Sequence, residues 1–481
     1  MSFGPDPRGA LTAVNRFGYG ARGGDSDDLA SAAADPRGFV LSELARPDAA
    51  LLAGPDLADS PRLIQEMFAF FAEQRAKRLQ KPAPEVMGME SQSAMAPRRP
   101  GEPRRAPRPP NVIQQAYLRD ASARFGRACT AEVGFVERLV AFWSNFFTVS
   151  AAKGPLVRIC AGAFEREAIR PHVLGRFADM LKAVERHPAM LVYLDNQFSF
   201  GPDSPAGRRT GRGLNENLAR ETMELHSIGV DGGYTQADVT NFAKILTGWT
   251  FARPRSRFAR PGTFAFFANA HEPGPQVVMG RTYSERGVEQ GLAVLDDLAR
   301  HSSTPTFVAT KLATHFIADA PPRALVERLA ETFRKSDGDL RAVSRALVET
   351  KEAWDAPLTK MRTPYDFLIA ANRAFGRVPE RPQPILGPLN MLGMPLWTAP
   401  QPNGFPDASQ AWASPEGMKL RLDIAARLGS QGGNLPVNPS QLLDQTLGAA
   451  ASQETRQTVA RAESRQQGFA LLLMSPEFQR R

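Results

Sequence analysis

Residues 135–146 read FVERLVAFWSNF, and this stretch indicates the fold class of the chain. Phe135, Leu139, Phe142 and Phe146 recur at i, i+4, i+7 and i+11, so they share one face of an amphipathic helix. The same period predicts further helices around residues 173–184, 239–246, 287–300, 304–317, 322–335, 338–351, 363–375, 415–428 and 455–474. We therefore expect an all-α, predominantly helical protein.

One segment, residues 262–283, has a different pattern. Phe264, Phe266 and Phe267 come before a Pro/Gly turn at 272–275, and a second apolar run, 277–279, follows it. Two short apolar runs around such a turn predict a small β-hairpin. The expected organisation is a single helical domain over residues 1–481 that contains this hairpin.

Residues 80–110 contain eight prolines and few bulky apolar residues. Nine Lys and Arg against three Glu between residues 75 and 108 give 9 − 3 = +6 of the total net charge of +9. Such a segment buries too little surface to offset its ordering entropy, so it is predicted to be a disordered insertion. It is either a tether for an anionic or SH3-like partner or a tolerated surface insertion. The rest of the chain is near charge balance, so no nucleic-acid partner is expected.

Cysteine content and apolar runs narrow the class of protein further. Cys129 and Cys160 are the only cysteines, which is neither a disulfide framework nor a CxxC metal knuckle. The sequence contains no apolar run near the roughly 18–20 residues of a membrane span. Residues 1–7 lack the basic start and apolar core of a signal peptide, so a cytoplasmic location is expected, with export left open.

The densest run of polar chemistry is residues 213–226, GLNENLARETMELH. On a helix, Glu216, Arg220 and Glu224 form an i, i+4, i+8 ladder, which is the usual way to stabilise an exposed helix. The alternative is that this face lines a cleft, with Asn215 and Glu216 beside a ligand. Glu221 and Glu224 would then act as an acid/base pair or as divalent-ion ligands, and Arg220 would orient an anionic group.

A metal site in this region needs ligands from outside the helix. His226 lies about 160° around an ideal helix from Glu224, so both reach one ion only if the helix ends near Leu225. Gly229 makes such an early end plausible. His271, at the turn of the expected hairpin, is the candidate second histidine ligand of a divalent metal ion, although a turn histidine is also a common surface residue.

A second cluster lies between residues 392 and 412. Trp397 and Trp412 bracket a loop that contains Asn403. Two indoles and an amide could hold a sugar or another flat ligand, or the indoles could anchor the loop to the core. The GxSxG, HExxH, P-loop and GxGxxG motifs of the standard hydrolases and nucleotide-binding proteins do not occur in a suitable context.

These residues together resemble a large bacterial group, the domain of unknown function 1800. The resemblance is carried by segments spread almost from end to end, namely residues 15–20 (NRFGYG), 142–147 (FWSNFF), 187–191 (HPAML), 213–226, 229–235 (GVDGGYT), 246–249 (LTGW), 271–272 (HE), 402–407 (PNGFPD) and 475–479 (SPEFQ). It implies one helical family domain over the whole chain. It also implies a possible partner, because such proteins are often encoded beside a family related to sulfatases and phosphatases.

The chain departs from the family pattern at two places. Phe146 stands where the resemblance implies a histidine next to Asn145. Glu272 and Gln276 stand where it implies an aspartate and a lysine after His271. If those positions carry chemistry in the family, that chemistry is altered or lost in this chain.

Two functions therefore remain open. The first is an accessory or binding protein that acts with a partner enzyme, and the family resemblance implies a sulfatase/phosphatase-like enzyme as one such partner. The second is a metal-assisted hydrolase that uses Glu221, Glu224, His226 and His271, in which case the four side chains must converge on one point in a concave site.

Overall fold

A computed structural model describes residues 6–24, 26–80, 110–256 and 259–481. The described chain is 62% helical, with 24 α-helices and two antiparallel two-stranded sheets. The predicted all-α class with a small β-hairpin is confirmed. The predicted disordered insertion at 80–110 lies outside the described residues, except for Gln80 and Pro110.

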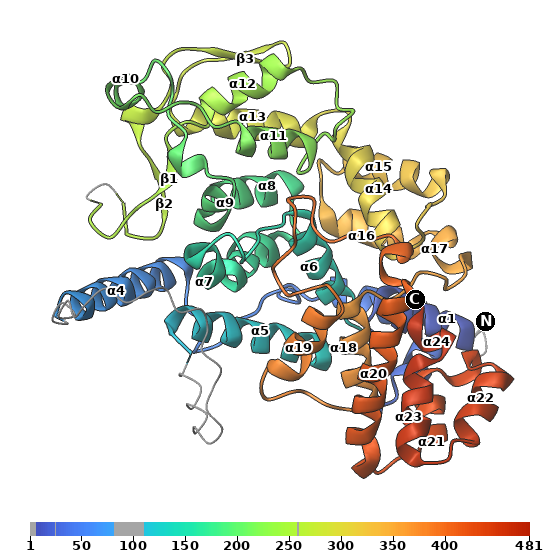
Figure 1. Ribbon diagram of the computed structural model, residues 1–481. Coiled ribbons are helices and arrows are strands. Elements are labelled where there is room, and N and C mark those ends of the chain that lie inside the picture. The colour runs from blue at the N-terminus through green and yellow to red at the C-terminus, as the bar shows by residue number, and fades with distance from the viewer. Residues whose placement is uncertain (1–5, 25, 81–109, 257–258) are drawn as a thin grey trace.

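The first three helices are short and the fourth is long, and α1, α3 and α4 carry a proline in the first turn. α4 follows the cap residue Asp59 and projects from the body, and its outer end exposes Phe71 and Leu79 (Figure 1). The helices of this segment are α1 (Pro7–Leu11), α2 (Asp28–Ala34), α3 (Pro36–Leu44) and α4 (Ser60–Leu79).

The second segment carries the stripe from which the fold class was predicted. α6 buries Phe135, Leu139, Phe142 and Phe146, as their spacing predicts. α8 ends at Arg186, directly before His187 and Pro188. The helices of this segment are α5 (Val112–Thr130), α6 (Phe135–Phe146), α7 (Pro155–Phe164), α8 (Phe177–Arg186) and α9 (Pro188–Tyr193).

The third segment holds both sheets. Thr235 and Asp238 form a capping box at the start of α12. The elements are α10 (Pro205–Thr210), α11 (Asn217–Glu224), α12 (Gln236–Ile245), β1 (Trp249–Phe251), β2 (Phe264–Phe266), β3 (Gln276–Val278), β4 (Arg281–Tyr283) and α13 (Val288–Arg300).

The strand pairing predicted within 262–283 is wrong in one respect. The run at 264–266 pairs with β1, where Phe264 packs edge-on against the Trp249 indole with ring centroids 5.3 Å apart, and not with the run at 277–279. That second run forms its own hairpin, β3–β4. Met279 and Gly280 have φ of 49° and 77°, the left-handed backbone of a two-residue hairpin turn.

The remaining helices follow the predicted spacing closely, and one prediction is wrong. The helix expected at 455–474 is two helices, because Ser464 accepts from the Gln467 amide and caps a new start. The helices are α14 (Thr304–Phe316), α15 (Arg323–Lys335), α16 (Leu340–Glu349), α17 (Lys351–Asp355), α18 (Pro364–Ala374), α19 (Gln383–Met391), α20 (Pro415–Gln431), α21 (Pro439–Thr446), α22 (Gln453–Ala460), α23 (Arg465–Met474) and α24 (Pro476–Gln479).

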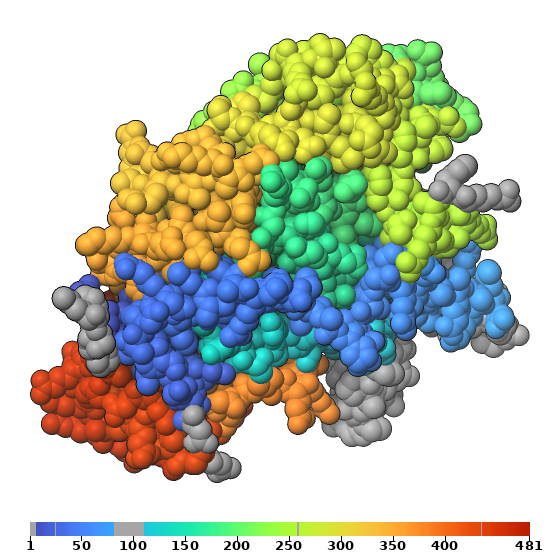
Figure 2. Space-filling model, turned by 180° about the vertical axis from the view of Figure 1, so that it is seen from behind, coloured from blue at the N-terminus to red at the C-terminus, as the bar shows by residue number. Residues whose placement is uncertain are grey.

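The described residues bury two separate apolar clusters. One extends from α1 to α17, and the other joins α5 to α18–α24. From behind, the N-terminal helices (blue) cross the surface between α14–α17 (orange) and the C-terminal helices (red) (Figure 2). No helix among the described residues is long and apolar enough to cross a membrane.

Candidate functional site

A cavity of about 70 Å³ lies where the two apolar clusters meet. Its walls come from α6, the end of α7, the start of α18 and the segment 394–407. The volume is several times the roughly 10–15 Å³ that one water needs, and about half of the roughly 150 Å³ cavity that holds benzene in another protein. Half-exposed Ser144 and Asn145 line it, so the cavity opens to solvent.

Glu165 is the most fully bonded charged group of the wall. It stands where α7 passes into a π-helical turn, Glu165–Ile169, a backbone irregularity that often marks functional positions. Arg124 lies 2.9 Å from its Oε2 and Arg170 lies 3.1 Å from its Oε1. Ser144 Oγ and the Trp397 indole also donate to Oε2, at 2.9 and 3.3 Å.

The Glu165 carboxylate is 2% exposed, so it depends on these donors for its charge. Burial alone would raise its pKa, but Arg124 and Arg170, with the two neutral donors, hold the pKa below its usual range. Arg170 also binds Glu137 through two hydrogen bonds of 2.7 and 2.9 Å. A buried chain of two acids and two guanidinium groups therefore supports one side of the cavity.

Trp397 forms the aromatic wall in a strained backbone conformation. Its φ of 47° is in the left-handed region, which costs a non-glycine residue about 1–2 kcal/mol. Two main-chain anchors hold it there: the Ala151 amide donates to its carbonyl at 2.7 Å, and the Tyr117 hydroxyl donates to the Leu396 carbonyl at 2.8 Å. The Arg124 guanidinium lies 5.6 Å from the indole centroid and 4.9 Å from the Tyr365 ring.

The segment 402–407 is fixed to α6 by the Asn145 side chain, which bonds to both the main-chain amide and the carbonyl of Phe405. Asn145 Nδ2 donates to the Phe405 carbonyl and Asn145 Oδ1 accepts from the Phe405 amide, both at 2.8 Å. Gly404, at φ 77°, makes this approach possible, since a Cβ there would lie 2.4 Å from the Asn145 carbonyl oxygen. The segment after α19 therefore lies against α6 (Figure 1).

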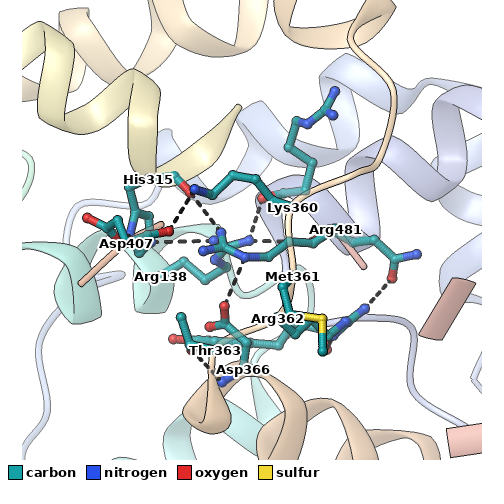
Figure 3. A network of polar contacts seen from close by, with 12 residues as sticks. Arg138, His315, Lys360, Met361, Arg362, Thr363, Asp366, Asp407 and Arg481 are labelled. Carbon is teal, nitrogen blue, oxygen red and sulfur yellow. Dashed lines mark hydrogen bonds and ion pairs between the residues drawn. The ribbon is translucent and has the colours of Figure 1, made fainter. Parts of the chain in front are cut away.

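His315 and Asp407 form a second polar pair in the wall (Figure 3). His315 Nδ1 lies 2.7 Å from Asp407 Oδ1, and its Nε2 lies 3.4 Å from Arg138 Nη2. A guanidinium group only donates, so Nε2 accepts from Arg138, and Nδ1–H donates to Asp407 Oδ1. Both ring nitrogens are thus occupied by the protein itself.

The floor below this pair is rich in buried cationic groups (Figure 3). Lys360, 1% exposed, donates to Asp319 Oδ1 at 2.7 Å and to the Asp407 carbonyl at 2.9 Å. Arg481 Nε lies 3.0 Å from Asp366 Oδ2, and its Nη1 donates to the His315 carbonyl at 3.0 Å. These contacts position both Asp366 and Asp407, which line the cavity.

The acid stability of the fold should depend on Asp407. Burial opposes its charge, but His315 and the cations Lys360 and Lys311 outweigh burial and keep its pKa below the usual range. A lowered folded-state pKa adds stability that is present above the unfolded-state pKa of about 3.9 and is lost as pH falls through the folded value. We expect Asp407→Asn to be less stable than the wild type at neutral pH. Urea unfolding at descending pH should show the gap closing below about pH 4, and a gap that widens with acid would contradict this assignment.

The residues predicted on 213–226 form a surface network. Arg220 pairs with Glu216 at 3.1 Å and with Glu224 at 3.4 Å, so the ladder exists, and these three side chains are 23–35% exposed. Thr240 and Gln236 of α12 donate hydrogen bonds to the Glu216 carboxylate. The bond from Thr240 is the main cause of the lowered pKa of Glu216. The ladder thereby ties α11 to α12. Outside the helix, Asn215 Oδ1 accepts from the amide of residue 217.

Each of the two predicted histidine ligands is bonded through Nδ1, and each Nε2 is buried without a hydrogen-bond partner among the described residues. α11 ends at Glu224, and His226 is buried with its Nδ1 2.7 Å from Glu185 Oε1. His271 Nδ1 lies 3.0 Å from the Thr247 carbonyl and donates to it. Half-buried Glu221 has its pKa raised by burial, with His226 opposing the shift. No three His, Cys, Asp or Glu side chains among the described residues are grouped to hold a metal ion. A metal role for these residues remains a prediction from the sequence.

The two tryptophans of the C-terminal loop have different roles. Trp397 lines the cavity, whereas Trp412 is 8% exposed and donates its indole N–H to the Pro406 carbonyl at 3.0 Å. Trp412 therefore anchors the loop. Asn403 is exposed and is not among the cavity-lining residues.

Sequence reasoning missed Arg124, Glu165 and His315. A signal was present, since each is an ionisable residue at a position that the helical period assigns to the buried face. In α14, for example, His315 follows Val308 at i+7, and both are buried. An ionisable residue on a buried face indicates either a buried ion pair or a functional site, and only its partner in the folded structure shows which of the two it is.

Comparison with known proteins gives one match. The model of the family described as "Protein of unknown function (DUF1800)" matches residues 12–480. No curated protein and no solved structure matches the chain.

Proposed function

Since the chain belongs to the DUF1800 family, whose members share no established activity, we propose a function from the cavity itself: this is a binding protein that holds the hydroxyl-bearing end of a small polar ligand. The observation that carries the proposal is the preformed Trp397 wall, fixed by Glu165 and by two main-chain anchors. The left-handed backbone of Trp397 costs stability, and a loop with a purely structural role would not need it.

The chemistry of the wall supports a ligand that donates hydrogen bonds. Three carboxylates, Glu165, Asp366 and Asp407, line the cavity with Arg124 and His315. Carboxylates accept from hydroxyl groups, and an indole face packs against the C–H groups of a sugar or polyol. A volume of about 70 Å³ admits only the end of such a molecule, with the rest in solvent.

The bonding of the wall supports binding over acid/base catalysis. A general base needs a lone pair within reach of the proton that it removes. Glu165 accepts from four side chains, and both ring nitrogens of His315 are engaged. Glu165 and His315 therefore hold the wall in place. The carboxylates left to accept from a ligand hydroxyl are Asp407 and Asp366, whose Oδ2 accepts no hydrogen bond among the described residues.

An accessory role beside a partner enzyme, which the family resemblance implies, is consistent with the outer half of α4. Phe71 and Leu79 are 41% and 78% exposed there, beside Arg75 and Arg78. Exposed apolar side chains next to arginines fit a partner with an acidic surface.

Ligand-observed NMR tests the binding proposal with glycerol and a panel of monosaccharides. We expect saturation transfer from the protein to at least one of them, with dissociation constants of about millimolar for such small ligands. Ala141→Leu, which fills the cavity from α6, should abolish the transfer. Ala69→Leu on exposed α4 is the matched control and should leave it unchanged.

The proposal fails if the wild type gives no transfer with any of these probes. It also fails if the folded Ala141→Leu variant gives the same transfer as the wild type.

A further inference from the structure

A second concave site lies around β1 and β2, formed by segments that the candidate site does not use. It is a groove of about 490 Å³, within the roughly 300–1,000 Å³ of ordinary small-molecule sites. Its walls are residues 196–200, the two strands and the segment 252–256. The groove shares no lining residue with the cavity beside Trp397.

The groove presents aromatic rings to solvent. Phe198 is 47% exposed and Phe267 is 38% exposed, and both line it with half-buried Phe200 and Phe266. Exposed large aromatic side chains that converge on one concavity are unusual on a surface with no bound partner. Flat apolar groups stack on such rings.

Arginines supply the only charged side chains of the described lining. Arg212, Arg253 and Arg255 line the groove, and all three are exposed. Arg212 lies over the Phe200 ring, 5.3 Å from its centroid. Within the described part of the chain, the three guanidinium groups have no hydrogen bond or ion pair to an acid. Their donors are therefore available to a ligand.

Two buried polar atoms beside the groove also lack a partner among the described residues. Asn196 donates both Nδ2 hydrogens, to the Leu246 and Trp249 carbonyls, but its Oδ1 accepts nothing, and the Trp249 indole N–H donates to nothing. Asn196 and Trp249 are 1% and 0% exposed, and both are lining residues. Unpaired buried polar groups are rare in folded proteins, so each of them calls for a bound water or ligand atom.

We propose that this groove binds a small organic anion with a flat apolar body, such as an aryl carboxylate or aryl phosphate. The rings of Phe198, Phe200 and Phe267 would cover the body, and Arg253 and Arg255 would bind the anionic group through charge-assisted hydrogen bonds. The positive charge excludes cationic and favours anionic ligands. This site is independent of the function proposed for the cavity, and either one stands without the other.

Calorimetric titration with a matched pair of probes tests the proposal. Naphthalene-2-carboxylate and the neutral naphthalene-2-carboxamide have the same ring and differ in charge. We expect the carboxylate to bind roughly tenfold or more tightly than the amide, because its hydrogen bonds are charge-assisted. The difference should shrink at high salt, since exposed charges are screened.

Three variants separate the contribution of the arginine charges from that of the aromatic rings. Arg253→Gln combined with Arg255→Gln should remove most of the preference for the carboxylate, while Phe198→Ala should weaken both probes alike. Arg461→Gln, an exposed arginine in the C-terminal helices with no side-chain partner among the described residues, is the control and should change nothing. All four positions are exposed, so unchanged thermal midpoints are expected to show that the variants fold.

Equal binding of the two probes, or no binding of either, would overturn the proposal. The proposal would also be overturned if Arg461→Gln weakened carboxylate binding as much as the Arg253→Gln/Arg255→Gln variant does. The loss would then come from the change in net charge and not from the groove.

Discussion

Replacing Glu165 by glutamine is expected to lower the free energy of unfolding by about 3–5 kcal/mol. The carboxylate is 2% exposed and accepts from Arg124, Arg170, Ser144 and Trp397. Glutamine keeps the shape of the side chain but leaves Arg124 without an anion and Arg170 with Glu137 alone. A buried charge that loses its counter-ion costs more than the pair contributed, because desolvation is no longer offset.

Urea unfolding followed by circular dichroism measures this loss. Glu349→Gln is the matched control, since Glu349 pairs with Arg345 on an exposed face of α16 and should leave the midpoint almost unchanged. A loss below about 1 kcal/mol for Glu165→Gln would show that the network is hydrated, and it would remove the physical basis of the fixed Trp397 wall.

Replacing Gly404 by alanine is the second change with a large expected effect. Gly404 has a φ of 77°, and a Cβ there would lie 2.4 Å from the Asn145 carbonyl oxygen and 2.7 Å from its Oδ1. Alanine therefore adds backbone strain of about 1–2 kcal/mol and a contact that forces the loop away from α6, at about 1–3 kcal/mol more. The Asn145–Phe405 bonds should then break, and the ligand binding proposed for the cavity should be lost with them.

Gly393 offers a control that separates the two costs. It has the same φ of 77°, but a Cβ there meets nothing within 4 Å. Gly393→Ala should therefore cost only the strain and keep the binding signal. Chemical unfolding and ligand-observed NMR on both variants make the comparison. Equal losses would mean that the approach of Gly404 to Asn145 is not what holds the loop.

The helices were predictable because their apolar spacing is determined by neighbours close in sequence. Phe135, Leu139, Phe142 and Phe146 point to one face whatever the rest of the chain does. Strand pairing was not predictable in the same way. The turn at 279–280 was overlooked because methionine rarely takes a positive φ. The cross-strand partner of Phe264 is Phe251, thirteen positions earlier across a loop.

The candidate site was only partly predictable. Trp397 was singled out because it and Trp412 bracket a loop that contains Asn403, and the structure places Trp397 in the cavity wall. Arg124, Glu165 and His315 were missed because a charged residue on a helix is normally read as exposed. What makes each of them part of a site is a partner far along the chain, such as Asp407 for His315, 92 residues away. The spacing of neighbouring residues in the sequence does not predict such long-range pairs.

The cavity walls join residues that are far apart in the chain, so the cavity forms late in synthesis. The Tyr117 hydroxyl meets the Leu396 carbonyl 279 residues later, and Asn145 meets Phe405 260 residues later. At synthesis rates of about 5–20 residues per second, α5 and α6 wait on the order of 15–60 s for the segment that closes the wall. During that interval Glu165 lacks the Trp397 indole as a donor, and the long loops still to be closed make this step slow. The binding proposed for the cavity should therefore arise late in synthesis, only after residue 405 has been added.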